Sequence, residues 1–143
     1  MLKILAAYAA LTFIAASPAI GRDTCVAEKL RAPAARGRVV YLRKNGVEDP
    51  IPNASLELRQ MEHGEWVTVS KTSSDERGHF DLQTVKPGKY ELLVNAPQMD
   101  AYSVRLQVLG ASGTIAKRKE VVVALAFLFM GCGDASVRKV KQK

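Results

Sequence analysis

The chain is poor in the side chains that most metal sites are built from. Its 143 residues include only two histidines, His63 and His79, sixteen positions apart. Neither lies in an H-x-x-x-H or H-x-x-E pattern, so a zinc site would need ligands from elsewhere in the chain. We interpret both histidines as surface residues and expect no metal and no cofactor.

Catalytic motifs are also lacking. The sequence contains no G-x-S-x-G motif of the kind that presents a nucleophilic serine. It also contains no glycine-rich loop of the kinds that bind nucleotide phosphates. We therefore predict that the chain is not an enzyme. A small hydrolase, with a triad assembled across the fold, is a remote alternative.

No apolar run is long enough for a confident membrane-spanning helix. The N-terminal run, residues 4–16, is uncharged, follows Lys3 and precedes a short stretch of small residues. This order is typical of a secretory signal peptide, cleaved after Ala19 or Gly21. We assign residues 1–21 to it and predict export to the periplasm, the cell surface or the medium, with no transmembrane helix in the mature chain. An uncleaved anchor or a core helix is the alternative.

Cysteine is scarce as well, with only Cys25 and Cys132. Neither belongs to a C-x-x-C motif, which argues against a reactive thiol pair. In the oxidising compartments of exported proteins, an even number of cysteines favours a disulfide. We predict a structural Cys25–Cys132 bridge, which would close a loop of just over one hundred residues. Loop-closure entropy sets an upper limit of about 4.7 kcal/mol on its stabilisation.

Acidic residues are outnumbered by basic ones. The chain has 14 aspartates and glutamates and 21 lysines and arginines, which gives a formal net charge of +7. Basic clusters lie at Lys117–Lys119 and Arg138–Lys143. Such a chain can contact anionic lipids, acidic polymers or nucleic acid, but charge runs are commonly solvated tails. We predict a basic C-terminal tail over residues 134–143. No aromatic residues interleave with the clusters, so we expect no nucleic-acid binding.

What the sequence does contain is a series of short alternating segments. From Arg36 onwards the sequence contains about seven short strand-like stretches, several of them with alternating apolar and polar residues, and turn signals roughly every ten residues. This pattern predicts an all-β fold, a single immunoglobulin-like, seven-stranded antiparallel β-sandwich over residues 36–133. The alanine-rich segment 22–35 is expected to be an extended leader or a short frayed helix.

Glycines mark the expected turns. Asn45-Gly46 ends the first stretch, and Gly78 ends a turn where a left-handed residue is often required. Pro87 and Gly88 would occupy the two central positions of a type II turn. We therefore expect the stretches on either side of that turn to be adjacent strands.

Together these residues resemble the carboxypeptidase regulatory-like domain, a transthyretin-like sandwich related to Cna-B collagen-adhesin repeats. The resemblance has three parts, which are G-x-V at residues 37–39 with I-P-N-A at 51–54, S-D-x-x-G-x-F-x-L at 74–82, and P-G-x-Y-x-L-x-V at 87–94. It implies a transthyretin-like fold in an exported bacterial protein. It also implies a module without catalytic activity of its own, in a group whose related sandwiches include accessory sugar-binding modules.

Two features bear on the function. The stretch Glu120–Met130 is apolar on both faces from Val121. It is either a central strand covered on both sides or an exposed face for self-association or partner binding. Trp66, the only tryptophan, either packs in the core or serves as a stacking platform for a ligand.

We predict an exported, non-catalytic module for protein or cell-envelope interaction, through the apolar last strand or a sheet edge. The alternative is a carbohydrate-binding accessory module that uses Trp66. The partner, an unknown protein or an envelope glycan, is not identified by the sequence.

Overall fold

The structure is a computed structural model, and it describes residues 25–82, 86–110, 118–126 and 132–140. The described residues form ten β-strands, which confirms the predicted all-β sandwich. The predicted signal peptide, residues 1–21, lies outside this part of the chain. No described segment is a helix long and apolar enough to span a membrane.

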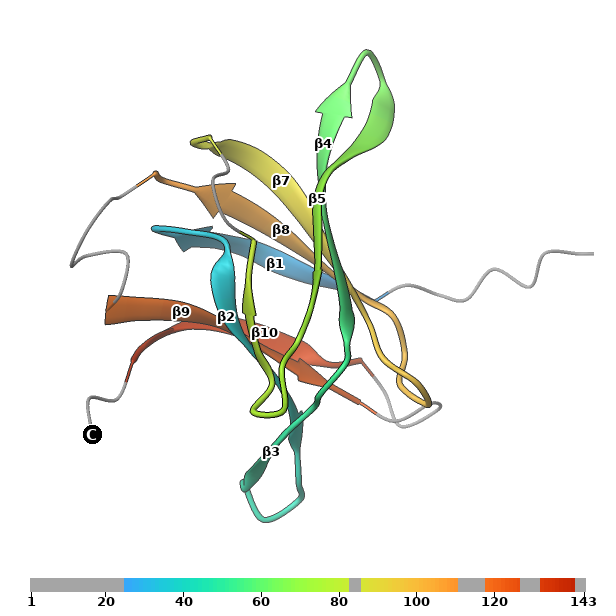
Figure 1. Cartoon of the computed structure of the whole chain (residues 1–143), viewed down its shortest axis with the longest axis vertical. Coiled ribbons are helices and arrows are strands. Elements are labelled where there is room, and N and C mark those ends of the chain that lie inside the picture. Colours follow the sequence, from blue (N-terminus) through green and yellow to red (C-terminus); the bar gives the residue numbers. More distant parts are fainter. Residues whose placement is uncertain (1–24, 83–85, 111–117, 127–131, 141–143) are drawn as a thin grey trace, which may run out of the picture.

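The strands form two sheets around one core (Figure 1). Sheet A contains, in spatial order, β1 (Cys25–Ala32), β8 (Tyr102–Val108), β7 (Gly88–Asn95), β4 (Ser55–Glu62) and β5 (Glu65–Ser73). Sheet B contains, in spatial order, β10 (Asp134–Lys139), β9 (Lys119–Leu125), β2 (Arg36–Leu42) and β3 (Glu48–Pro50). The short strand β6 (His79–Asp81) also pairs with β2. In Figure 1 the β4–β5 hairpin projects beyond the rest of the sandwich.

Apolar side chains from both sheets fill the space between them. Leu56, Leu58 and Leu92 of sheet A are fully buried, as are Val39 and Val123 of sheet B, and all belong to one cluster. Successive side chains of a strand point to opposite faces, so the residues between these are placed on the outer faces of the sheets. The alternation in the sequence therefore determines which side chains the outer faces present.

The sandwich extends beyond both ends of the predicted domain, residues 36–133. The expected leader or frayed helix at 22–35 contains β1, which pairs in parallel with β8. The expected basic tail at 134–143 contains β10, which pairs antiparallel with β9. The predicted number of seven strands is therefore wrong. Purely antiparallel pairing is wrong too, because β2 and β9 also pair in parallel.

Both end strands carry a weak sequence signal. In β1, only Leu30 and Ala32 among the described side chains pack on the core, and in β10 only Ala135 and Val137 do. Most of the other described side chains in these strands are charged or polar. These two segments form strands because they pair with a neighbouring strand, and their own composition does not show which strand that is.

The strands around Pro87 and Gly88 are not neighbours, contrary to the prediction. β6 pairs with β2 in sheet B, whereas β7 pairs with β4 and β8 in sheet A. The chain therefore crosses between the sheets after β6, and Gly88 begins β7 without a positive φ. Alternation identified both strands correctly, but it does not specify which sheet a strand joins.

The apolar stretch near the C-terminus is a central strand, which confirms one of its two interpretations. β9 lies between β10 and β2, and residues 121–125 are all buried. Alternate residues face the core between the sheets, while Val122 and Ala124 cluster with Val40 on the outer side of sheet B. The described part of this stretch thus has no exposed apolar surface for self-association. Residues 127–131 lie outside the described chain.

Sheet B depends on the absence of a side chain at Gly37. This residue lies opposite Val121 of β9 on one side and Phe80 of β6 on the other. A Cβ atom at Gly37 would lie 1.7 Å from the carbonyl oxygen of Val121, which is far inside contact distance. The predicted left-handed turn at Gly78 is confirmed by its φ of +75°.

Replacing Gly37 by alanine is expected to destabilise the protein strongly, because the new methyl group can be accommodated only if β2 and β9 separate. We expect a loss of about 3 kcal/mol, the upper end for overpacking, measured by urea unfolding. Gly46→Ala is the matched control, since Gly46 has a φ of +81° but open space around it. It should cost only about 1 kcal/mol, the usual penalty of a left-handed residue. Equal losses in the two variants would contradict this account.

Candidate functional site

The strongest candidate for a functional surface is the outer face of sheet A around Trp66. Trp66 lies on the edge strand β5 and pairs in register with Met61 of β4. Trp66 is 48% exposed and Met61 is 50% exposed. Core packing, one of the two interpretations of Trp66, is therefore wrong. Its role as a stacking platform stays a prediction.

A groove of about 300 Å³ lies beside this residue, and we call it the Trp66 groove. It is lined by Lys29, Met61, Trp66, Lys89, Tyr90, Arg105 and Leu106. These residues come from all five strands of sheet A. The groove therefore crosses the strands instead of following one of them, and its lining comes from segments that are far apart in the sequence.

The strand register explains why the groove has cations on its rim. Tyr90 of β7 and Leu106 of β8 pair with each other and are buried, so they face the core. Lys89 and Arg105 each lie one residue away and point to the opposite face. Lys29 of β1 is exposed as well. Three strands thus each contribute one exposed cation to the groove.

Arg59 of β4 links Trp66 to a polar network. Its guanidinium carbon lies 5.9 Å from the centroid of the indole ring, within the range of a cation–π contact. Its Nη2 atom donates a hydrogen bond to Oε2 of Glu91 at 3.0 Å, and the Ser103 hydroxyl donates to Oε1. Both oxygens of Glu91 are therefore engaged. The Nε atom of Arg59 is buried and has no hydrogen-bond partner among the described residues.

The other carboxylate on this face, Glu57, is also engaged. The Lys71 ammonium lies 2.8 Å from it, and this hydrogen bond is the main cause of the lowered pKa of Glu57. No ion pair joins Lys29, Lys89 or Arg105 to any residue in the part of the chain that the structure describes. The outer face of sheet A therefore carries a surplus of positive charge beside an exposed aromatic ring.

Solved structures that are similar to this one include transthyretins. Transthyretin from Sparus aurata aligns with a TM-score of 0.50 over 73% of this chain and 99% of that chain, at 16% identity. Sea bream transthyretin in complex with thyroxine aligns with a TM-score of 0.48 over 73% and 97%, at 18% identity. The fold is transthyretin-like. At this level of identity the likeness extends to the fold alone.

No protein-family model and no curated protein matches the sequence. The resemblance to the carboxypeptidase regulatory-like domain is thus confirmed only as far as its transthyretin-like fold. Membership of that family and a bacterial origin stay predictions.

A second hollow, of about 450 Å³, lies where β5 and the turn after it approach β2 and β6. Its lining carries both signs of charge, with Arg36, Asp75, His79 and Glu120 among its residues. His63 and His79 are exposed, which confirms their interpretation as surface residues. Within the described ranges, no group of three or more His, Cys, Asp or Glu side chains could hold a metal ion.

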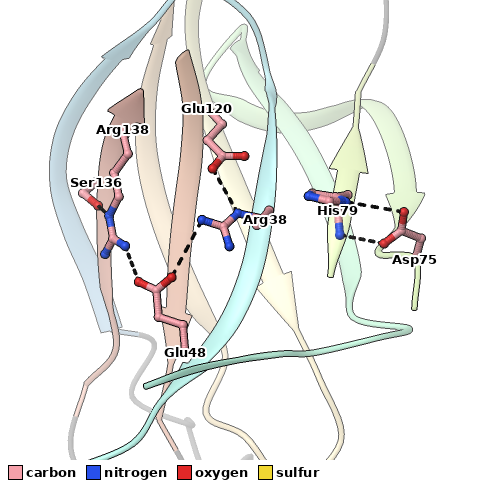
Figure 2. Close-up of polar contacts among 7 residues, drawn as sticks. All are labelled: Arg38, Glu48, Asp75, His79, Glu120, Ser136 and Arg138. Carbon is pink, nitrogen blue, oxygen red and sulfur yellow. Dashed lines mark hydrogen bonds and ion pairs between the residues drawn. The ribbon is translucent and has the colours of Figure 1, made fainter. Parts of the chain in front are cut away.

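The outer face of sheet B carries a row of paired charges (Figure 2). Glu48 forms ion pairs with Arg138 and, at 3.7 Å, with Arg38, and the Nε atom of Arg38 donates to Glu120 at 2.9 Å. These side chains lie on the same face as the small apolar cluster of β2 and β9, whose two valines are almost fully buried. Because the charges satisfy one another, we interpret this row as part of the packing of sheet B.

One cysteine lies on a strand of sheet A, and the other lies just before a strand of sheet B. Cys25 begins β1, an edge strand of sheet A, and Cys132 closely precedes β10, an edge strand of sheet B. β1 and β10 lie close together. No described cysteine is free. The predicted bridge involves the side chain of Cys25, which lies outside the described part of the structure, so the bridge stays a prediction.

The turn between β5 and β6 is held by Asp75. Its Oδ1 atom accepts hydrogen bonds from the backbone N–H groups of Arg77 at 2.9 Å and His79 at 2.8 Å. The bond from the His79 amide is the main cause of the lowered pKa of Asp75. A carboxyl group whose pKa is lowered by folding stabilises the fold above its unfolded-state pKa. This stabilisation disappears as the pH falls through the folded-state pKa.

The Asp75→Asn variant should therefore lose stability only where the native carboxyl is ionised. We expect its Tm to lie below that of the wild type at neutral pH, and the gap to close as the pH falls below 3.8, the ordinary value for Asp75. Thermal unfolding followed by circular dichroism across this range measures the gap. A gap that stays constant down to strongly acidic pH would show that the charge of Asp75 plays no part.

Proposed function

We propose that the chain is an exported, non-catalytic β-sandwich module that binds a component of the cell envelope. The Trp66 groove carries this proposal. Its lining combines a half-exposed tryptophan with three cations that have no ion-pair partner in the described chain. Concave surfaces that combine aromatic side chains with a few polar groups are the usual form of a ligand site.

The groove is a better candidate than the apolar last strand. Residues 120–125 of β9 are buried and cannot contact a partner without unfolding sheet B. Trp66, in contrast, is 48% exposed, and an indole ring is large enough to cover the apolar face of a sugar ring. Carbohydrate binding is therefore the form of envelope interaction that the geometry favours most.

A protein partner is the second candidate, and strand β5 favours it. β5 is the outermost strand of sheet A, and most of its nine residues are exposed, including Val67 and Val69. An exposed edge can accept an extended segment of another protein as an additional strand. The register shift opposite Leu58 and Arg59 interrupts this edge, which makes continuous pairing less favourable.

Capture of solubilised cell envelope on the immobilised mature protein tests both candidates. The captured material is analysed for sugar and for protein, with wild type, Trp66→Ala and the double variant Val67→Ser/Val69→Ser in parallel. We expect the wild type to retain glycan, the Trp66→Ala variant to lose it, and the double variant to keep it. All three replaced residues are at least 40% exposed, so each variant should keep the native circular dichroism spectrum.

The other outcomes of this capture are equally informative. If the wild type retains one discrete protein and only the double variant loses it, the function is strand addition at β5 and not glycan binding. Retention of neither sugar nor protein by the folded wild type would contradict the proposed function.

The oxidation state of Cys25 and Cys132 tests the proposed export. If the mature protein passes through an oxidising compartment, we expect no titratable thiol in denatured, unreduced protein and two after reduction. Because β1 and β10 belong to different sheets, the bridge would join them covalently. Two thiols in the unreduced protein would rule the bridge out.

A further inference from the structure

We propose that the ligand of the Trp66 groove is an acidic oligosaccharide, a sugar chain that carries carboxylate groups. This inference rests on the proposed function and adds the chemical class of the ligand. Its basis is the charge around the groove. All ionised side chains of the lining are cations, and they are Lys29, Lys89 and Arg105.

The positive charge of the groove is available to a ligand. Lys29, Lys89 and Arg105 are all exposed, and none has an ion-pair partner among the described residues. Glu91, the carboxylate paired in register with Arg105, has its two oxygens engaged by Arg59 and Ser103. A bound carboxylate would therefore meet cations that the protein itself does not neutralise.

The layout of the groove favours a chain over a small ion. Lys29 lies on β1 and Trp66 on β5, the two outermost strands of sheet A. Four strand spacings separate them, which is roughly 19 Å between strand axes at the usual distance of about 4.8 Å. Lys29 and Trp66 therefore contribute to the groove from opposite edges of the sheet. A linear ligand lying across the strands can stack one ring on Trp66 and place its charges near Lys89, Arg105 and Lys29.

The aromatic content of the groove favours sugar over nucleic acid. Sites for single-stranded nucleic acid stack successive bases on several aromatic side chains. Only Trp66 is exposed here, because the other aromatic residue of the lining, Tyr90, is 6% exposed and donates its hydroxyl to the Lys86 carbonyl. Arg59 lies against the ring of Trp66, so it is a positioning residue for the platform.

Binding of two matched oligosaccharides tests the inference. The probes are an oligogalacturonate and its methyl ester of the same length, which keeps the sugar rings and removes the charge. Titration is followed by the fluorescence of Trp66, the only tryptophan, and by calorimetry. We expect the acid to bind at least about tenfold more tightly than the ester, with an affinity that falls as salt is added, because exposed charge pairs are screened.

Variants locate the effect in the groove. The triple variant Lys29→Gln/Lys89→Gln/Arg105→Gln should lose about two- to fivefold in affinity for each charge removed, and about tenfold or more in total. The control variant Lys44→Gln/Arg77→Gln/Lys139→Gln removes the same charge from exposed positions outside the groove and should bind like the wild type. Equal losses in both variants would reduce the effect to net charge and overturn the inference.

Three further outcomes would overturn it in distinguishable ways. Equal affinity for acid and ester would leave a sugar-binding groove without selectivity for charge, so the proposed function would stand. An oligothymidylate of matched charge that binds as tightly, and is lost in the same triple variant, would make the site one for polyanions in general. No binding of the acid would reject the ligand class, and the envelope capture would then decide the proposed function independently.

Discussion

At Gly37, strand β2 is enclosed between β9 and β6 with room for a hydrogen atom and nothing larger. Two residues further along, the Val39 amide donates to the Gly78 carbonyl, and the Val39 carbonyl accepts from the Ile51 amide. A few residues of β2 therefore bind three other segments of backbone at once. Sheet B is assembled around this point, and the buried positions of Phe80 and Ile51 in the core follow from it.

The two outer faces of the sandwich use charge in opposite ways. On sheet B, Glu48 lies between two arginines and the charged row is neutral within itself (Figure 2). On sheet A, the two carboxylates of the face are each engaged by a cation, and further cations remain beside Trp66. Among the described residues, the charges on the outer face of sheet B satisfy one another, whereas the outer face of sheet A keeps exposed cations beside an exposed aromatic side chain. This difference is why the proposed binding surface is placed on sheet A, since function depends on the site and not on the scaffold.

Local pattern was sufficient to predict the fold class, since period-two alternation at residues such as Leu56, Leu58 and Leu92 needs no knowledge of partners. It was insufficient for β1 and β10, whose stability comes from distant strands, and for the assignment of β6 and β7 to different sheets. The candidate site was predictable only in part. Trp66 is conspicuous as the single tryptophan, but Lys29, Lys89 and Arg105 become neighbours through strand order, which alternation does not encode.

The pairing of the first strand has a consequence for how the chain can fold. Cys25 of β1 pairs with Tyr102 of β8, seventy-seven residues later, and β9 pairs with β2 across a similar distance. Loops of this length must close before either contact contributes stability, so folding should be slow compared with that of proteins rich in local contacts. Neither sheet can be completed while the chain is still emerging, because each one includes strands from both halves of the sequence. The sequence order of the strands therefore delays folding until nearly the whole chain is available.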